Sequence, residues 1–117
     1  MVIAAVDDLL FSSKIRTVAR QLGVEVAFAR SPDAIVAGVR ERRPALLVVD
    51  LNGEKMAPIE TIRAITADPG LAGTRVIAFV SHVQTATIRA AQDAGAHEVL
   101  PRSTFAASLP DILSGAK

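Results

Sequence analysis

The chain of 117 residues has no cysteine, tryptophan or tyrosine, and its aromatic residues are four phenylalanines. The lack of cysteine excludes disulfides, thiolate metal sites and thiol nucleophiles, and it is typical of a cytoplasmic protein. The scarcity of aromatic residues argues against a surface on which nucleic-acid bases stack. Because thirteen lysines and arginines face twelve aspartates and glutamates, we expect no attraction to nucleic acid or to a membrane through net charge.

Long hydrophobic runs are also lacking, and the apolar run 2–6 is too short for a signal peptide or a membrane span. Half of the residues are nevertheless hydrophobic and 21% are charged, which excludes intrinsic disorder. The length lies within the usual range of one domain, so we expect a single domain over residues 1–117 with an aliphatic core.

Short apolar runs predict five strands, at residues 2–6, 24–28, 45–49, 76–80 and 97–100. The run 45–49 is apolar throughout, as expected of a central strand that is buried on both faces. Glu25 interrupts the run 24–28, which places that strand nearer an edge of the sheet.

Apolar residues at helical spacing lie between the predicted strands. Ser31 followed by Pro32 predicts the start of a helix that runs to about residue 42. Helices are also predicted over about residues 11–22 with a stop at Gly23, around residues 59–65, and over 85–94. The last helix contains Pro110, so we expect it to be kinked or split.

Strands that alternate with helices favour a doubly wound α/β domain, in which right-handed crossovers connect parallel strands. We expect a five-stranded parallel sheet of order 2-1-3-4-5 in a flavodoxin-like three-layer sandwich. Ligands bind to such sheets at the carboxyl ends of the strands.

Polar residues follow four of the five predicted strands: Asp7 and Asp8, Asp50 and Asn52, Ser81, and Arg102. In the expected strand order the first and third strands are neighbours, so up to three carboxylates meet at one edge. Their mutual repulsion is relieved by protonation or by a divalent cation. Mg²⁺ suits a site of one or two carboxylates, a carbonyl and water molecules.

Three segments, 5–8, 46–52 and 94–102, resemble the receiver domain of bacterial two-component response regulators, and the resemblance extends over essentially the whole chain. The resemblance implies a signalling module without enzymatic activity. Asp50 then matches the aspartate that accepts a phosphoryl group, and Asp7 and Asp8 match the acidic pair that holds Mg²⁺ together with Asp50 and the backbone carbonyl of Asn52. The implied partners are a sensor histidine kinase or phosphotransfer protein and a downstream protein target.

Three positions depart from the family pattern. Val80 stands where the family has a hydroxyl, with Ser81 one residue later, Arg102 replaces a lysine, and Val99 replaces an aromatic residue. Ser81 is interpreted either as a phosphate ligand or as the N-cap of the helix 85–94, and Arg102 either as a phosphate ligand or as a surface residue.

Two alternatives remain open at this stage. A degenerate receiver would act as a phosphorylation-independent interaction module, above all if Asp7 rather than Asp8 takes the second acidic position and the metal loses a ligand. A small flavin- or nucleotide-binding protein would use the same crevice. His82 and His97 share no metal-ligand spacing, and we expect both to face solvent.

Overall fold

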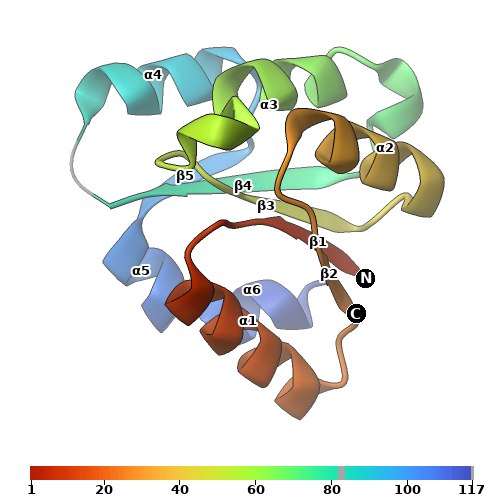
Figure 1. The fold of residues 1–117 in the computed structure, drawn as a ribbon, viewed down its shortest axis with the longest axis vertical. Coiled ribbons are helices and arrows are strands. Elements are labelled where there is room, and N and C mark those ends of the chain that lie inside the picture. The colour runs from red at the N-terminus through yellow and green to blue at the C-terminus, as the bar shows by residue number, and fades with distance from the viewer. Residues whose placement is uncertain (82–83, 117) are drawn as a thin grey trace.

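The computed structural model describes residues 1–81 and 84–116. Its sheet has five parallel strands in the order β2-β1-β3-β4-β5, which confirms the predicted topology (Figure 1). The strands are β1 (Val2–Ala5), β2 (Val26–Phe28), β3 (Leu46–Asp50), β4 (Arg75–Val80) and β5 (Glu98–Pro101). As predicted, β3 is central and fully buried, and β2 lies at an edge.

Helices cover both faces of the sheet (Figure 1). One face carries α2 (Pro32–Arg42), α3 (Pro58–Thr66) and α4 (Thr85–Asp93), and the other carries α1 (Leu9–Leu22), α5 (Arg102–Ala107) and α6 (Leu109–Ser114). Two 3-10 turns, η1 (Glu54–Met56) and η2 (Pro69–Leu71), flank α3. Each face of the sheet has its own apolar cluster, so the chain forms the expected flavodoxin-like three-layer sandwich. No helix in the described part of the chain combines the length and apolar character needed to cross a membrane.

Local sequence signals explain where several helices begin and end. The Ser31 hydroxyl accepts a hydrogen bond from the backbone N–H of Ala34 at 3.1 Å and so caps α2. Gly23 ends α1 with a φ of 71°, a conformation that glycine adopts without steric cost. The C-terminal helix is split rather than kinked, because Pro110 lies in the first turn of α6, where its missing N–H removes no helical hydrogen bond.

The start of β5, next to His97, differs from the prediction. The structure begins the strand one residue later, and the Nδ1 atom of His97 accepts a hydrogen bond from the backbone N–H of Val76 at 3.0 Å. His97 is exposed as expected, but its imidazole also extends the hydrogen bonding between β4 and β5, a contact that the sequence did not indicate. His82 lies outside the described residues.

Three phenylalanines pack together beneath the carboxyl ends of the strands. The ring centroid of Phe79 lies 4.9 Å from that of Phe11 and 4.7 Å from that of Phe105. All three rings are buried, and they join α1, β4 and α5 on one face of the sheet. Phe79 pairs with Asp50 in the ladder between β3 and β4, so the cluster directly adjoins the candidate site.

Candidate functional site

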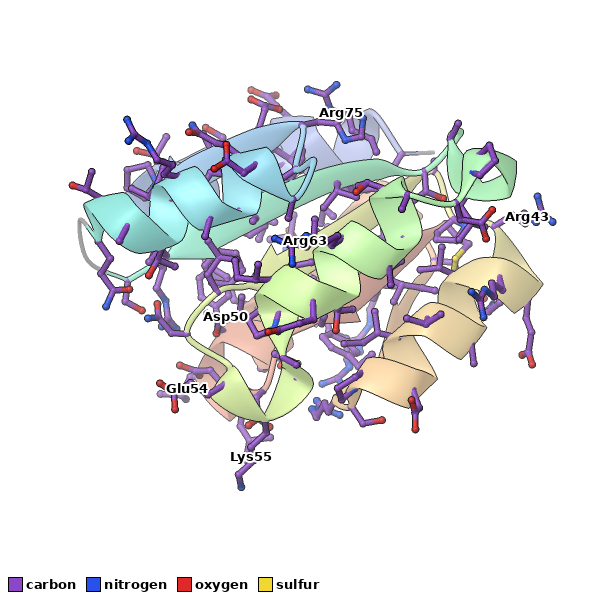
Figure 2. All side chains as sticks on the ribbon, turned by 90° about the horizontal axis from the view of Figure 1, so that it is seen from above. Arg43, Asp50, Glu54, Lys55, Arg63 and Arg75 are labelled. Carbon is purple, nitrogen blue, oxygen red and sulfur yellow. The ribbon has the colours of Figure 1, made fainter. Side chains whose placement is uncertain are left out.

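The acidic residues that follow β1 and end β3, Asp7, Asp8 and Asp50, meet at the carboxyl ends of these strands, as the strand order predicted. They line an open cavity of about 490 Å³ together with Leu9, Leu10, Asn52, Gly53 and Arg102. The neighbouring strands β1 and β3 end level with one another, because Ala5 pairs with Val49. Glu54 and Lys55 of η1 are exposed and extend away from the body of the protein beyond Asp50 (Figure 2), so the charge in the cavity comes from its lining residues.

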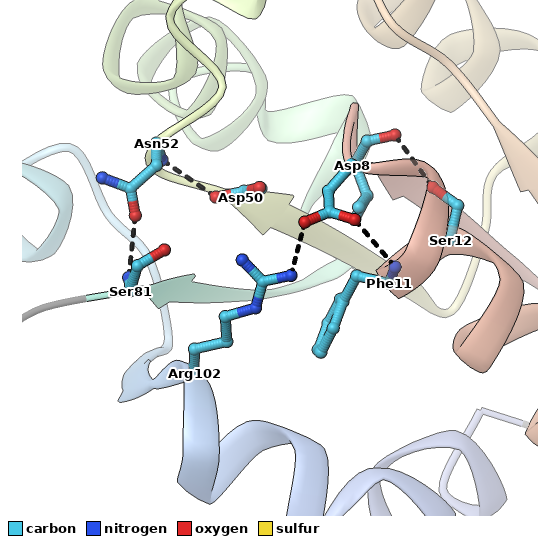
Figure 3. Close-up of polar contacts among 8 residues, drawn as sticks. Asp8, Phe11, Ser12, Asp50, Asn52, Ser81 and Arg102 are labelled. Atoms are coloured by element: carbon cyan, nitrogen blue, oxygen red, sulfur yellow. Dashed lines mark hydrogen bonds and ion pairs between the residues drawn. The ribbon is translucent and has the colours of Figure 1, made fainter.

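Asp50 is the most buried carboxylate of this cavity, with 5% of its surface exposed. Its Oδ1 atom accepts a hydrogen bond from the backbone N–H of Asn52 at 2.9 Å (Figure 3). Burial raises the pKa of Asp50, and the negative charges of Asp8 and Asp7 add to this effect, although the N–H of Asn52 and the charge of Arg102 oppose it. A carboxylate with a raised pKa is the more basic and therefore the stronger oxygen nucleophile.

The raised pKa predicts that Asp50→Asn stabilises the fold at neutral pH. Above the unfolded-state pKa near 3.8 the folded wild type must first hold a proton that the unfolded chain has lost, and above its own raised pKa it must carry a buried charge. The amide has neither cost, and its oxygen still accepts from Asn52. The free energy of unfolding of the variant should exceed that of wild type by an amount that grows from pH 3.8 up to the folded pKa and is constant above it. Urea unfolding followed by circular dichroism from pH 3 to 8 measures this difference.

Asp33→Asn is the matched control, because Asp33 is exposed in the first turn of α2. There the loss of a charge near the helix N-terminus should cost only a few tenths of a kcal/mol. Equal free energies of unfolding for wild type and Asp50→Asn at pH 7 would show that burial of the Asp50 charge does not destabilise the fold.

Asp8 uses both carboxylate oxygens within the protein (Figure 3). Oδ1 accepts from the backbone N–H of Phe11 at 2.9 Å and caps α1, while Oδ2 accepts from Nη2 of Arg102 at 2.7 Å. The hydrogen bond from Arg102, followed by that from Phe11, holds the pKa of Asp8 below its usual value. Asp7 is exposed at the rim of the same cavity, so Asp8 is the member of the acidic pair that turns inward.

Arg102 is the first residue of α5, immediately after β5. Its guanidinium carbon lies 4.5 Å from the centroid of the Phe11 ring, so the group stacks on this aromatic side chain while it binds Asp8. The interpretation of Arg102 as an ordinary surface arginine is therefore wrong. The sequence placed Arg102 at the correct strand end but did not indicate that Asp8 is its partner.

Asn52 connects the loops that follow β3 and β4. Its side-chain oxygen accepts from the backbone N–H of Ser81 at 2.7 Å, and its amide nitrogen donates to Oε1 of Gln84 at 3.1 Å. The interpretation of Ser81 as the N-cap of α4 is wrong, because α4 begins at Thr85 and Gln84 takes the cap position. Val80 is buried and has no side-chain donor to offer to the cavity.

The donor atoms at this edge fit Mg²⁺ in their chemistry. No three His, Asp or Glu side chains within residues 1–81 and 84–116 gather closely enough to hold a metal ion by themselves. Mg²⁺ does not need such a cage, since it binds through one or two carboxylates and keeps several water molecules. Asp8, Asp50 and Asn52 line an open cavity with room for water, and their carboxylate and carbonyl oxygens are of the kind that Mg²⁺ prefers.

Comparison with known proteins agrees with this geometry. The sequence model of the response regulator receiver domain matches residues 2–113. The phosphorylated cyanobacterial phytochrome response regulator RcpA is 21% identical with a TM-score of 0.81, over 97% of this chain and 88% of that one. The chemotaxis response regulator CheY4 of Vibrio cholerae is 17% identical with a TM-score of 0.83, over 99% and 97% of the two chains. The Mn²⁺-bound form of response regulator Rcp1 is 20% identical with a TM-score of 0.78, over 97% and 88%. No curated protein sequence matches this chain.

The chain therefore belongs to the response regulator receiver domain family. It is a receiver domain of two-component signal transduction. The match to this family favours a signalling function over the binding of a flavin or nucleotide.

Proposed function

We propose that Asp50 accepts a phosphoryl group from a phosphohistidine of a sensor histidine kinase or phosphotransfer protein, and that the chain then signals through protein contacts without catalysing a reaction of its own. The observation that carries this proposal is the place of Asp50, a buried carboxylate of raised pKa that lines a cavity shared with Asp8, Asn52 and Arg102. The cytoplasmic location expected from the cysteine-free sequence is part of the proposal.

The transfer requires little from the protein beyond position and charge. One Asp50 oxygen is held by the N–H of Asn52, which leaves Oδ2 to attack phosphorus. An O–P bond forms as the N–P bond breaks, and the imidazole leaves with the bonding electrons and takes up a proton. Arg102 lines the same cavity as Asp50 and can donate to a phosphoryl oxygen, whereas the backbone N–H of Ser81 already donates to the side chain of Asn52.

Mg²⁺ would be held by Asp8, Asp50, the backbone carbonyl of Asn52 and, from the rim, Asp7. When bound, the ion supplies neutralisation of the negative charge on the transferring group. This assignment is supported by the all-oxygen donor set and by the family, one member of which has been solved with Mn²⁺ bound.

The phosphoryl acceptor is tested by incubation with acetyl phosphate and Mg²⁺, followed by intact-mass measurement. Wild type should gain one phosphoryl group and Asp50→Asn none. Asp33→Asn is the control, because it removes an exposed carboxylate from α2 and should leave the labelling unchanged.

A specific observation also supports the phosphorylation-independent module as a second candidate. Val80 offers no hydroxyl to read a phosphoryl group, and Asp8 is already engaged by Arg102. Wild type that stays unlabelled after prolonged incubation with acetyl phosphate would contradict the first proposal and favour this second one.

A further inference from the structure

The ion pair between Asp8 and Arg102 occupies a carboxylate that the proposed function assigns to Mg²⁺. Both oxygens of Asp8 have donors, one the backbone N–H of Phe11 and the other the guanidinium of Arg102. A cation that binds Oδ2 of Asp8 would lie within a few ångströms of the guanidinium, since the Nη2–Oδ2 distance is 2.7 Å. Two positive groups so close repel one another strongly, so each weakens the binding of the other to this oxygen.

The position of Arg102 is built into the fold rather than left to a mobile surface side chain. Phe11, on which the guanidinium stacks, is 7% exposed and packs in the three-phenylalanine cluster. The side chain of Arg102 is 31% exposed and that of Asp8 36%, so the pair lies partly out of solvent, where charges are screened less than on an open surface. Arg102 is therefore a counter-ion that the protein itself supplies to the acidic cavity.

We propose that Arg102 and a divalent cation compete for Oδ2 of Asp8, so that the arginine holds this oxygen when no metal is bound and a cation displaces it. This inference rests on the proposed function, because it concerns the metal that the phosphoryl acceptor would use. Binding of the metal would release the guanidinium from Asp8, and the released group, which lines the same cavity as Asp50, would then be free to bind a phosphoryl group there.

Metal titration of purified protein without a phosphoryl donor tests the competition directly. Isothermal titration calorimetry with Mg²⁺ should show about tenfold tighter binding to Arg102→Ala than to wild type, because the loss of one nearby positive charge favours the metal. Arg102→Gln keeps much of the length of the side chain without its charge and should behave in the same way. Circular dichroism should show both variants folded, since Asp8 keeps its cap to Phe11.

Arg75→Ala is the matched control. Arg75 also pairs with a carboxylate, that of Glu98 at 2.8 Å, but it begins β4 and pairs in register with the first residue of β3, whereas Asp50 ends β3. The Arg75→Ala substitution removes the same charge from the amino-terminal ends of the strands, away from the cavity, and should leave the Mg²⁺ affinity unchanged.

A spectroscopic measurement on wild type is independent of substitution. The Nε–H resonance of Arg102 in ¹⁵N NMR should shift as Mg²⁺ is added and should saturate together with the calorimetric signal. Equal Mg²⁺ affinity in wild type and Arg102→Ala, or an Arg102 resonance that stays in place, would overturn the competition. Labelling of wild type by acetyl phosphate would still support the proposed function in that case. Absence of both Mg²⁺ binding and labelling in every variant would overturn the two proposals together.

Discussion

Phe79→Ala is expected to lower the free energy of unfolding by about 3–5 kcal/mol, the cost of removing a fully buried aromatic ring and leaving a cavity behind. Phe79 has no exposed surface and touches the rings of both Phe11 and Phe105, so its loss removes contacts to α1 and to α5 at once. Urea unfolding followed by far-ultraviolet circular dichroism measures the change, since the chain has no tryptophan whose fluorescence would report it.

Phe28→Ala is the control for this substitution, because it removes the same side chain from the edge strand β2, where the ring is only half-buried. Its cost should be well below that of Phe79→Ala. Equal losses would show that the cluster of three rings adds nothing beyond ordinary burial. The cluster also bears on function, since Phe11 supports the guanidinium of Arg102.

Gly95→Ala should destabilise the protein by about 1–3 kcal/mol, because the backbone there suits glycine alone. Gly95 has a φ of 105°, and an added Cβ would lie 2.6 Å from the hydroxyl oxygen of Thr66. That hydroxyl donates to the carbonyl of Ala94, so Thr66 cannot rotate away without losing a hydrogen bond. Thermal unfolding followed by circular dichroism measures the loss.

Gly73→Ala provides the contrast, since an added Cβ meets no atom within 4 Å at that position. The change should be neutral or slightly stabilising, because alanine restricts the unfolded chain more than glycine does. A Gly95→Ala variant as stable as Gly73→Ala would show that neither the backbone conformation nor the contact with Thr66 costs energy.

The strands and their order could be predicted because their signals are local and repeated. The run 45–49 is apolar throughout and became the buried central strand β3, while Glu25 marked the edge strand β2. Ligands bind to parallel sheets at the carboxyl ends of the strands, so the sequence also predicted that Asp8 and Asp50 lie at one site. In the structure they line one cavity. These inferences need only the burial pattern of each segment and the handedness of its connections.

The contacts within the site could not be predicted, because they join residues far apart in the sequence. Arg102 and Asp8 are 94 positions apart, and the length of the arginine decides that it reaches α1. Asn52 matched a position known for its backbone carbonyl, yet its side chain makes the link to Ser81. Nothing in the composition of the loops shows which side-chain atoms will meet, since this depends on rotamers and on the exact ends of β4 and α4.

The edge strand β2 is short and flanked by charged side chains, which hinders its pairing with strands of other chains. An open strand edge offers unpaired N–H and C=O groups to any second strand, and proteins block such edges by making them short and charged. β2 has three residues, and the guanidinium groups of Arg16 and Arg30 lie over the ring of Phe28 at 4.7 Å and 5.3 Å from its centroid. A strand this short, flanked by two cationic side chains, offers few free hydrogen-bonding groups to a second chain.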